Sequence, residues 1–313
     1  MLRLATISEL GEVKKPLHLA LGVFDGAHLG HQAVIGAAVE GARASGGVAG
    51  VMTFEPHPIR VLAPEKAPRR ILASIEHKER LLEELGVEVL LVLEFTAKFA
   101  QRAADEFAGE LLAAPTLRQI AAGDDWQFGR DRAGTVGLLR RLGAERGVEV
   151  SAIAPVMLQG ERVSSTRVRQ ALRDGNLAAA AAMLGRPYTV MGEVVRGEQL
   201  GSKLGIPTAN IEVGSEQLPP DGVYAVRTRA AGAERPGVAN LGVRPTVDGE
   251  RRLLEVHLFD FEGDLYGQHV EVQFGRRLRG ERKFEGLEGL KEQILKDVET
   301  GRGWFAEGTA LAV

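Results

Sequence analysis

Short apolar runs alternate with stretches of helical period from the start of the chain to about residue 185. Several runs, such as VEVLLVLEF, are continuously apolar, which is typical of strands buried on both faces of a parallel sheet. The pattern predicts strands at residues 17–24, 48–54, 87–95, 117–122 and 148–154. Between them it predicts helices at residues 31–45, 75–85, 97–112 and 134–146. This alternation predicts an α/β fold with a doubly wound parallel sheet.

The pattern changes after a short helical stretch at residues 176–184, where Gly185, Arg186 and Pro187 interrupt the chain. Beyond them, short β-type runs separated by glycine turns predict a small antiparallel barrel or sandwich. The predicted strands are residues 188–195, 222–228, 253–261 and 269–274, and the predicted turns are at 221–222, 248–249 and 262–263. We place the domain boundary after residue 185, which gives domains 1–185 and 186–313.

A last helix is predicted near the end of the chain. Its apolar positions recur every three to four residues, at Phe284, Leu287, Leu290, Ile294 and Val298. Such a spacing gives one apolar face, and we expect that face to pack on the barrel.

The composition is that of a soluble globular protein, and it excludes several kinds of chemistry. The 313 residues carry a formal net charge of only −3, so we expect a small-molecule or protein partner and no nucleic acid. The absence of cysteine excludes disulfides, thiolate nucleophiles and cysteine-ligated metals. No secretory leader and no run of ~20 apolar residues is present, so we expect a cytoplasmic protein without a membrane partner. The oligomeric state is left open.

The string GVFDGAHLGH, residues 22–31, stands where the first strand passes into the first helix. There the helix N-terminus points free N–H groups and the positive end of its dipole toward the crevice where ligands bind. Glycines such as Gly22 let the backbone approach a phosphate, and His28 and His31 can project to the same side. On spacing alone, such a histidine pair is more often incidental than catalytic.

Taken whole, this string resembles the HxGH motif of the nucleotidylyltransferase superfamily, in the form found in prokaryotic bifunctional riboflavin kinases/FAD synthetases. The resemblance implies a Rossmann-like FMN adenylyltransferase domain. It further implies that His28 and His31 are catalytic and that Gly22 and Phe24 belong to the ATP-binding segment. Imidazoles placed there stabilise the charge that develops when the α-phosphorus is attacked.

A second element, VSSTRVRQAL, starts with hydroxyl residues at a predicted helix start. By itself it is an ordinary helix cap. Beside HxGH it resembles the superfamily's ISSTxxR motif. The resemblance implies that Ser164, Ser165 and Thr166 bind ATP phosphates. It implies that Arg169 is a catalytic residue that grips the β- and γ-phosphates and the departing pyrophosphate.

Two other segments match the family less closely. In TFEPHP, Glu55 stands where aspartate is frequent, and His57 is a candidate for lining the flavin site. In AAGDDWQFG, Asp125 and Trp126 stand where Asn or Asp and Phe are usual, and the resemblance implies flavin binding for Asp125. A rigid loop supported by proline and aromatic packing explains both segments equally well.

The stretch GEVVRGEQLGSKLGIPTAN, residues 192–210, is rich in glycine and ends in Pro-Thr-Ala-Asn. Its spacing differs from that of a Walker A loop, and a glycine-rich loop alone is more often a hairpin connection. The Thr208 hydroxyl and the Asn210 carbonyl are hard oxygen ligands suited to Mg²⁺ that bridges nucleotide phosphates. The stretch resembles the GxxLGxPTAN pattern of riboflavin kinases. That resemblance implies that Thr208 and Asn210 bind the metal and that Gly197 and Lys203 bind ATP.

The run LLEVHLFDF places Glu255 on one strand face with Leu253, His257 and Phe259. Among apolar neighbours the carboxylate should have a raised pKa, which suits a general base, although a solvated strand face explains the pattern equally well. The run resembles the ExHxxDF region of riboflavin kinases, which implies that Glu255 is the catalytic base.

The two motif sets together imply a bifunctional enzyme that uses ATP and Mg²⁺. The C-terminal domain is expected to phosphorylate riboflavin to FMN. The N-terminal domain is expected to transfer an adenylyl group from a second ATP to FMN, which gives FAD and pyrophosphate. Three alternatives remain: an adenylyltransferase for another acceptor, a kinase whose first domain has decayed, and a flavin-binding module without activity. The presence of both motif sets argues against each of them.

Overall fold

The computed structural model describes residues 1–68, 70–197, 201, 204–246, 249–282, 284 and 286–307. The chain forms two compact units. The first comprises Met1–Arg69 and Ile75–Ser164, and the second comprises Arg70–Ser74 and Ser165–Val313. Among the described residues, no helix is long and apolar enough to cross a membrane.

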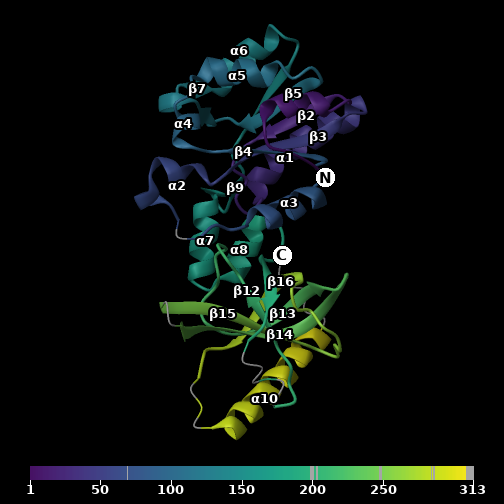
Figure 1. Ribbon diagram of the computed structural model, residues 1–313, viewed down its shortest axis with the longest axis vertical. Helices are drawn as coiled ribbons and strands as arrows, with labels where there is room; N and C mark the ends of the chain where they lie inside the picture. Colours follow the sequence, from purple (N-terminus) through teal and green to yellow (C-terminus); the bar gives the residue numbers. More distant parts are fainter. Residues whose placement is uncertain are drawn as a thin grey trace. The chain divides into compact units, whose positions relative to one another are not determined.

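The first unit is built on a six-stranded parallel sheet with the order β1-β4-β3-β2-β5-β8 (Figure 1). Its strands are β1 (Leu2–Leu4), β2 (Leu17–Leu21), β3 (Val48–Glu55), β4 (Val89–Glu94), β5 (Leu117–Gly123) and β8 (Glu149–Ile153). All five predicted strands are confirmed, with ends that differ by a few residues. The edge strand β1 was missed because three residues with one buried side chain carry no periodic signal.

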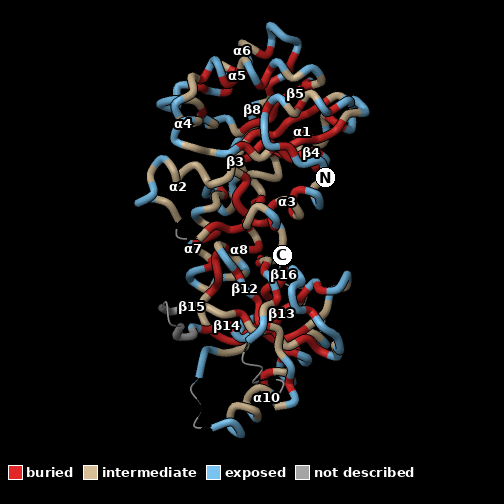
Figure 2. The backbone as a smooth tube through the Cα atoms, viewed as in Figure 1, coloured by how far each residue is buried: buried red, intermediate tan, exposed pale blue. Residues whose placement is uncertain are grey.

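Helices cover both faces of this sheet. On one face, α1 (Leu29–Ser45) and α3 (Ile75–Glu84) bury apolar side chains against the strands. On the other face lie α5 (Ala104–Leu112), α6 (Val136–Ala144) and the 3-10 helix η1 (Ile7–Glu12). The two faces explain why the strands are continuously apolar, and Figure 2 shows the strands as the buried centre of the unit.

The prediction of a single helix at residues 97–112 was wrong. The segment forms α4 (Ala97–Ala100) and then α5, because Ala103 has extended backbone (φ −64°, ψ 146°). Its apolar period continues across this break, so periodicity alone could not locate it. Short elements complete the unit: α2 (Pro58–Leu62), η2 (Pro64–Lys66), η3 (Arg130–Arg132), and the strand pairs β6 (Gln127–Phe128) with β7 (Gly134–Thr135) and β9 (Met157–Leu158) with β10 (Glu161–Arg162).

The second unit contains a closed antiparallel barrel with the order β11-β12-β15-β14-β13-β16. Its strands are β11 (Thr189–Val195), β12 (Ala209–Glu212), β13 (Gly222–Ala230), β14 (Ala233–Thr246), β15 (Gly249–Leu258) and β16 (His269–Arg279). The sequence pattern did not predict β12 and β14. The strand-like sequence pattern of β14 is interrupted by Pro236, Gly237, Gly242 and Pro245. The strand nonetheless pairs along its length with β13 and β15. The predicted turn at 248–249 includes residue 248, which lies outside the described residues.

The last helix, α10 (Leu287–Ala306), packs beside β13, β14 and β16 (Figure 1). The predicted apolar face was wrong at Leu287, whose residue surface is 54% exposed. The buried positions farther along the helix are Asp297, Gly301 and Trp304. A β-carbon on Gly301 would lie 2.5 Å from Val238 Cγ1, so the helix approaches β14 closely there. A buried aspartate and a glycine carry no apolar signal, and for this reason periodicity missed them.

Two further helices, α7 (Ser165–Arg173) and α8 (Leu177–Leu184), belong to the second unit. The segment Arg70–Ser74 also belongs to this unit. It is held there by hydrogen bonds such as that from Ser74 N to Glu216 Oε1 (2.7 Å). The units therefore divide by contacts after Ser164, whereas the functional boundary after residue 185 stays a prediction.

Candidate active sites

The first candidate site lies at the carboxyl edge of the parallel sheet. The chain passes from β2 to β3 and β4 on one side and to β5 and β8 on the other, so the order reverses between β2 and β5. Ligands of doubly wound sheets bind at this point. The loop at residues 22–28 follows β2, and the loop at residues 124–126 follows β5. The topology therefore brings the GVFDGAHLGH and GDDW segments to neighbouring strand ends.

The loop after β2 is shaped by its own aromatic residue. The ring of Phe24 is 1% exposed, and a β-carbon on Gly22 would lie 2.9 Å from its Cζ atom. Phe24, Gly26 and Ala27 all have positive φ (52°, 80° and 41°), so the backbone turns sharply before α1. Gly22 is therefore required by packing. The Phe24 side chain lies in the core, and a contact of its backbone with ATP stays a prediction.

His28 is the N-cap of α1. Its Nδ1 accepts a hydrogen bond from the backbone N–H of His31 (3.3 Å), which satisfies one amide of the helix start. Since Nδ1 is an acceptor, a neutral His28 carries its proton on Nε2. The two imidazoles are stacked, with ring centroids 3.6 Å apart, and the Phe24 ring meets His31 edge-on. The predicted proximity of the histidines is confirmed.

His31 is held as a neutral imidazole. Desolvation lowers its pKa well below the ordinary value, and the positive charges of His28, Lys78 and Arg162 lower it further. Its Nδ1 is buried and has no hydrogen-bond partner among the residues that the structure describes. An unpaired buried nitrogen at a helix start is costly in the free protein, and it marks a place where a ligand can complete the hydrogen bonding.

Asp125 is already engaged by an arginine. Both of its carboxylate oxygens accept from Arg162 of β10, at 2.5 and 3.1 Å, and the hydrogen bond holds the pKa of Asp125 below its usual value. Trp126 stacks on Phe128 (centroids 4.8 Å apart) at the border of the apolar core. The ion pair and the aromatic packing thus hold this segment as a rigid loop. Flavin binding by Asp125 stays a prediction.

His57 also has a capping role. It is the N-cap of α2, and its Nδ1 accepts from the backbone N–H of Ile59 (3.3 Å). It follows the cis Glu55–Pro56 peptide bond at the end of β3, so it lies at the carboxyl edge of the sheet. The position is compatible with the predicted flavin contact, which no observed interaction tests.

The SSTxxR segment begins close to the helix that carries the histidines. A β-carbon on Gly30 would lie 3.7 Å from the carbonyl oxygen of Val163, the residue before Ser164. Ser165 and Thr166 form the first turn of α7, and Arg169 is buried one turn further on. The boundary between the two units runs between Ser164 and Ser165, so the joint action of Arg169 with the histidines stays a prediction.

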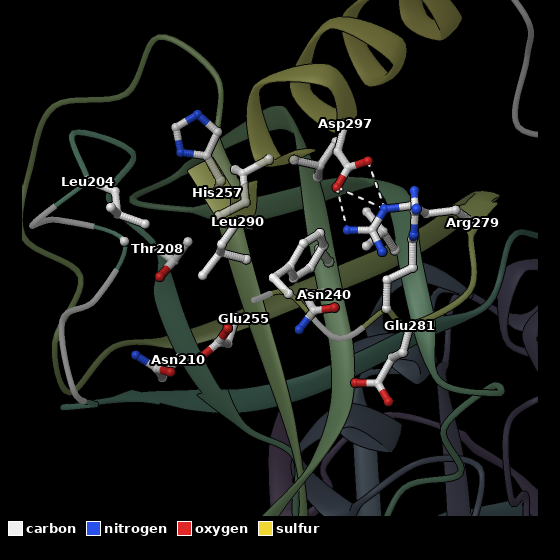
Figure 3. Close-up of a pocket in the computed structure, with 17 residues that line it drawn as sticks. Leu204, Thr208, Asn210, Asn240, Glu255, His257, Arg279, Glu281, Leu290 and Asp297 are labelled. Carbon is white, nitrogen blue, oxygen red and sulfur yellow. Dashed lines mark hydrogen bonds and ion pairs between the residues drawn. The ribbon is translucent and has the colours of Figure 1, made fainter. Parts of the chain in front are cut away.

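The second candidate site is a cavity of about 250 Å³ in the barrel unit (Figure 3). One row of residues crosses five neighbouring strands at this level, because each pairs with the next in the barrel register. The row consists of Asn210, Glu255, Asn240, Val223 and Arg279. All five line the cavity, so the register of the barrel assembles the site from distant parts of the chain.

Glu255 lies between two amide side chains of this row. It pairs with Asn210 on β12 and with Asn240 on β14, and Figure 3 shows the three side chains beside one another. Its neighbours along the strand, Leu254 and Val256, are 1% exposed, whereas Glu255 itself lines the cavity. Glu255 therefore faces the cavity, in accordance with the face predicted from the period-two pattern.

The glycine-rich loop lies directly against the PTAN residues. A β-carbon on Gly197 would lie 2.4 Å from Asn210 Nδ2, and one on Gly201 would lie 3.0 Å from Thr208 Oγ1. Asn210 is buried, and its Oδ1 has no hydrogen-bond partner within the described part of the chain. Lys203, predicted to bind ATP, lies outside the described residues.

Thr208 lines a second cavity as well. This cavity has a volume of about 300 Å³ and is bounded by Pro207, Leu258 and Tyr266 among others. The guanidinium of Arg196 lies over the Tyr266 ring, 4.9 Å from its centroid. Thr208 is thus a lining residue of both cavities, one of which contains Glu255 and the other Tyr266.

Two residues that matter to these sites were not found from the sequence. Lys78 of α3 is 4% exposed and donates to the carbonyl oxygen of Val23, in the loop after β2 (2.9 Å). Arg279 lines the barrel cavity and is bound by Asp297 of α10 through Nε and Nη2 (2.7 to 3.1 Å; Figure 3). Lys78 belongs to none of the motifs, and Arg279 was not singled out as a site residue. The tertiary structure brings both to the sites.

The fold and the sites define a transferase that handles nucleotide phosphates at two separate places. The doubly wound unit presents a helix N-terminus with two imidazoles, and the barrel unit presents a carboxylate between amide side chains.

Comparison with known proteins identifies the family. The family model described as FAD synthetase matches residues 11–167, and the model described as riboflavin kinase matches residues 184–305. The bifunctional riboflavin kinase/FMN adenylyltransferase of Escherichia coli K12 is 42% identical over 289 residues, 92% of each chain. The relative of the same name from Bacillus subtilis 168 is 36% identical over 293 residues, again 92% of each. The chain belongs to the family of bifunctional riboflavin kinases/FMN adenylyltransferases, and the predicted resemblance is confirmed.

A solved structure shares the fold over nearly the whole chain. A crystal structure described as a macrolide-efflux protein from Streptococcus pneumoniae is 34% identical and gives a TM-score of 0.82. It covers 97% of this chain and 100% of its own. Its described activity agrees with neither family model nor with the curated relatives, so the likeness supports the fold and not an efflux function.

Proposed function

We propose that the two activities of the family are divided between the two units. The barrel transfers the γ-phosphoryl group of ATP to the 5′-hydroxyl of the riboflavin ribityl chain, which gives FMN. The observation that carries this assignment is the row in which Glu255 lies between Asn210 and Asn240, near Thr208, which lines both cavities. Phosphoryl transfer needs donor and acceptor to meet in line, and two cavities that share a lining residue suit this requirement.

Glu255 would accept the proton of the attacking hydroxyl. The cavity around it is lined on the side of α10 by Leu290 and Ile294, which suit an apolar flavin ring, while the second cavity would take ATP. Glu255 is the one carboxylate of the polar row, so it is the group of that row that can act as a base. The glycines at 197 and 201 let the loop approach Thr208 and Asn210 closely, because a β-carbon at either position would clash with these neighbours.

Mg²⁺ fits the donors of this site. No group of three or more His, Asp or Glu side chains able to hold a metal occurs within the described residues, so protein oxygens would supply only part of the coordination. The orphan Oδ1 of Asn210 and the hydroxyl of Thr208 would hold the ion together with phosphate oxygens and water. When bound, the ion would neutralise charge on the transferred phosphoryl group.

The first unit would then join FMN to the adenylyl group of a second ATP. The FMN phosphate attacks the α-phosphorus, the bond to the β-phosphate oxygen breaks, and pyrophosphate leaves as FAD forms. The Nε2–H of His28, the neutral His31 and the N–H groups at the start of α1 would stabilise this charge. Ser164 and Arg169 would hold the leaving phosphates, as the family resemblance implies.

The remaining expectations follow from these reactions. The partners would be riboflavin, FMN and ATP, with no nucleic acid or membrane involved, and the reactions would take place in the cytoplasm. A direct test is to incubate the full chain with riboflavin, ATP and Mg²⁺ and to separate the flavins by chromatography. FMN and FAD should both appear. Absence of both products across a range of pH and in the presence of a reductant would refute the proposal.

A further inference from the structure

Lys78 is a buried cation that neither reaction scheme uses. It lies on the inner face of α3 with Leu81 and Leu82, and it is 4% exposed. Its ammonium donates to the Val23 carbonyl oxygen (2.9 Å) and to Thr53 Oγ1 (3.4 Å). The Thr53 hydroxyl donates to the same carbonyl oxygen (2.9 Å). The Val23 carbonyl is therefore held from two sides, by α3 and by β3.

Burial of the Lys78 ammonium group costs folding free energy, so its presence at this position calls for an explanation. Burial lowers the pKa of Lys78, and the nearby carboxylates of Asp25 and Glu55 act in the opposite direction. An apolar side chain would fill the inner face of α3 without such a desolvation cost. Arg80, two positions along the same helix, shows the ordinary arrangement, with an ion pair to Glu84 (3.7 Å) near the surface.

The carbonyl that Lys78 holds belongs to the loop that leads into the histidines. Val23 stands between Gly22 and Phe24, where the backbone begins its turn of positive φ toward His28. A shift of the Val23 carbonyl would move the Phe24 ring, which meets His31 edge-on at 5.4 Å. The geometry of the helix start thus depends on what fixes this carbonyl.

We propose that Lys78 is a positioning residue for adenylyl transfer, because its ammonium fixes the Val23 carbonyl and thereby the loop that places His28 and His31. The inference rests on the assignment of adenylyl transfer to the first unit. The charge has a second consequence, because Lys78 together with His28 and Arg162 lowers the pKa of His31. Loss of this charge should therefore raise the pH at which His31 becomes protonated.

The test uses Lys78→Met in the full chain, a change that keeps the length of the side chain and removes the ammonium. We expect kcat for the conversion of FMN to FAD to fall about 10- to 100-fold, with KM for ATP within about threefold, since catalytic groups rather than binding groups are displaced. The acid limb of the pH profile of kcat should move to higher pH. Phosphorylation of riboflavin in the same sample should be unchanged.

Arg80→Met is the matched control on the same helix, and it should leave both activities and the acid limb as in the unchanged chain. Thr53→Val covers the case in which Lys78→Met fails to fold. It keeps the ammonium but removes the hydroxyl that shares the Val23 carbonyl, so kcat should fall about three- to tenfold while the acid limb stays in place.

Three results would overturn the proposal. One is a Lys78→Met protein with unchanged kcat and acid limb for adenylyl transfer. Another is an equal loss of both activities in a folded Lys78→Met protein, which would indicate a general structural role. The last is an unfolded Lys78→Met protein combined with full activity of Thr53→Val. Failure of the underlying assignment would look different, since replacement of His28 would then leave FAD formation intact.

Discussion

The site of the first unit is formed at one end of a helix, whereas the site of the barrel is spread along a row of paired strands. His28 and His31 are three residues apart, and the capping bond between them fixes both the ring position and the tautomer. Asn210, Glu255 and Asn240 come from three strands and are aligned only by the barrel register. The comparison teaches that a local motif can supply preorganised N–H groups and a helix dipole, whereas a carboxylate on a strand gains its polar neighbours from other strands.

If the two sites are separate, replacement of Glu255 should have the largest and most selective effect. Glu255→Gln keeps the shape and removes the proton acceptor, so FMN formation should fall about 10²- to 10⁴-fold, the usual contribution of a general base. Conversion of supplied FMN to FAD should continue at the rate of the unchanged chain. Chromatography of the flavins, started once from riboflavin and once from FMN, measures both. Equal loss of both conversions would contradict the division between the units.

Replacement of His28 should affect only the first unit. Two different substitutions can separate its role as N-cap from its role in adenylyl transfer. Asparagine is a good N-cap, so His28→Asn should preserve the hydrogen bond to the His31 amide while it removes the Nε2–H donor. We expect adenylyl transfer to fall about 10²- to 10³-fold with little change in stability. His28→Ala should lose about 1 kcal/mol of stability in addition. Unaltered FAD formation by His28→Asn would show that the imidazole is dispensable.

Phosphorylation of riboflavin should depend on the packing of α10 against the barrel, whereas adenylyl transfer should not. Asp297→Asn weakens the paired hydrogen bonds to Arg279 and should cost about 1.5–3 kcal/mol, as is usual for hydrogen bonds to charged groups. Because Leu290 and Ile294 of the same helix line the cavity, KM for riboflavin should rise more than kcat falls.

The chain offers a convenient readout for this change. Its two tryptophans are Trp126 in the first unit and Trp304 on α10, so a Trp126→Phe background reports the barrel by fluorescence during denaturant unfolding. Glu299→Gln, an exposed position of α10, is the matched control and should leave both stability and KM unchanged. A stable Asp297→Asn protein with normal KM would show that the ion pair does not position the helix.

The same contrast explains how much could be predicted from the sequence. Five of the six strands of the parallel sheet and the histidine pair are encoded locally, by apolar runs and by a contiguous motif, and they were found. The strand β14 was hidden by its prolines and glycines, and its existence depends on pairing with β13 and β15. Asn240 was therefore not predicted as a site residue, and its place beside Glu255 appeared with the register.

Charged residues on buried faces were the hardest to predict. Lys78 and Asp297 lie on helical faces that periodicity assigns to apolar side chains or to solvent. Each is explained by hydrogen bonds to residues outside its own helix, from Lys78 to Val23 and from Arg279 to Asp297. Sequence patterns report the average environment of a residue type. A buried lysine or aspartate departs from that average, so only its hydrogen-bond partner, given by the tertiary structure, accounts for it.

The smallest expected effect concerns the response of the first unit to pH. The folded state holds the pKa of His31 below its ordinary value near 6.5, so as pH falls below about 6.5 the unfolded chain takes up a proton that the folded chain refuses. Stability contributed by the neutral His31 is therefore present above that pH and declines below it, by at most about 1.4 kcal/mol per pH unit. Trp126 fluorescence in a Trp304→Phe background would follow unfolding of this unit between pH 5 and 7.5.

His31→Gln supplies the control for this measurement, because glutamine keeps a polar side chain without a titrating group. Its unfolding free energy should fall less steeply with decreasing pH than that of the parent, and the two curves should run parallel above pH 7. Identical slopes would mean that His31 titrates alike in the folded and unfolded chains. In that case the electrostatic part of the contrast between the two sites would be lost, and only the difference in architecture would remain.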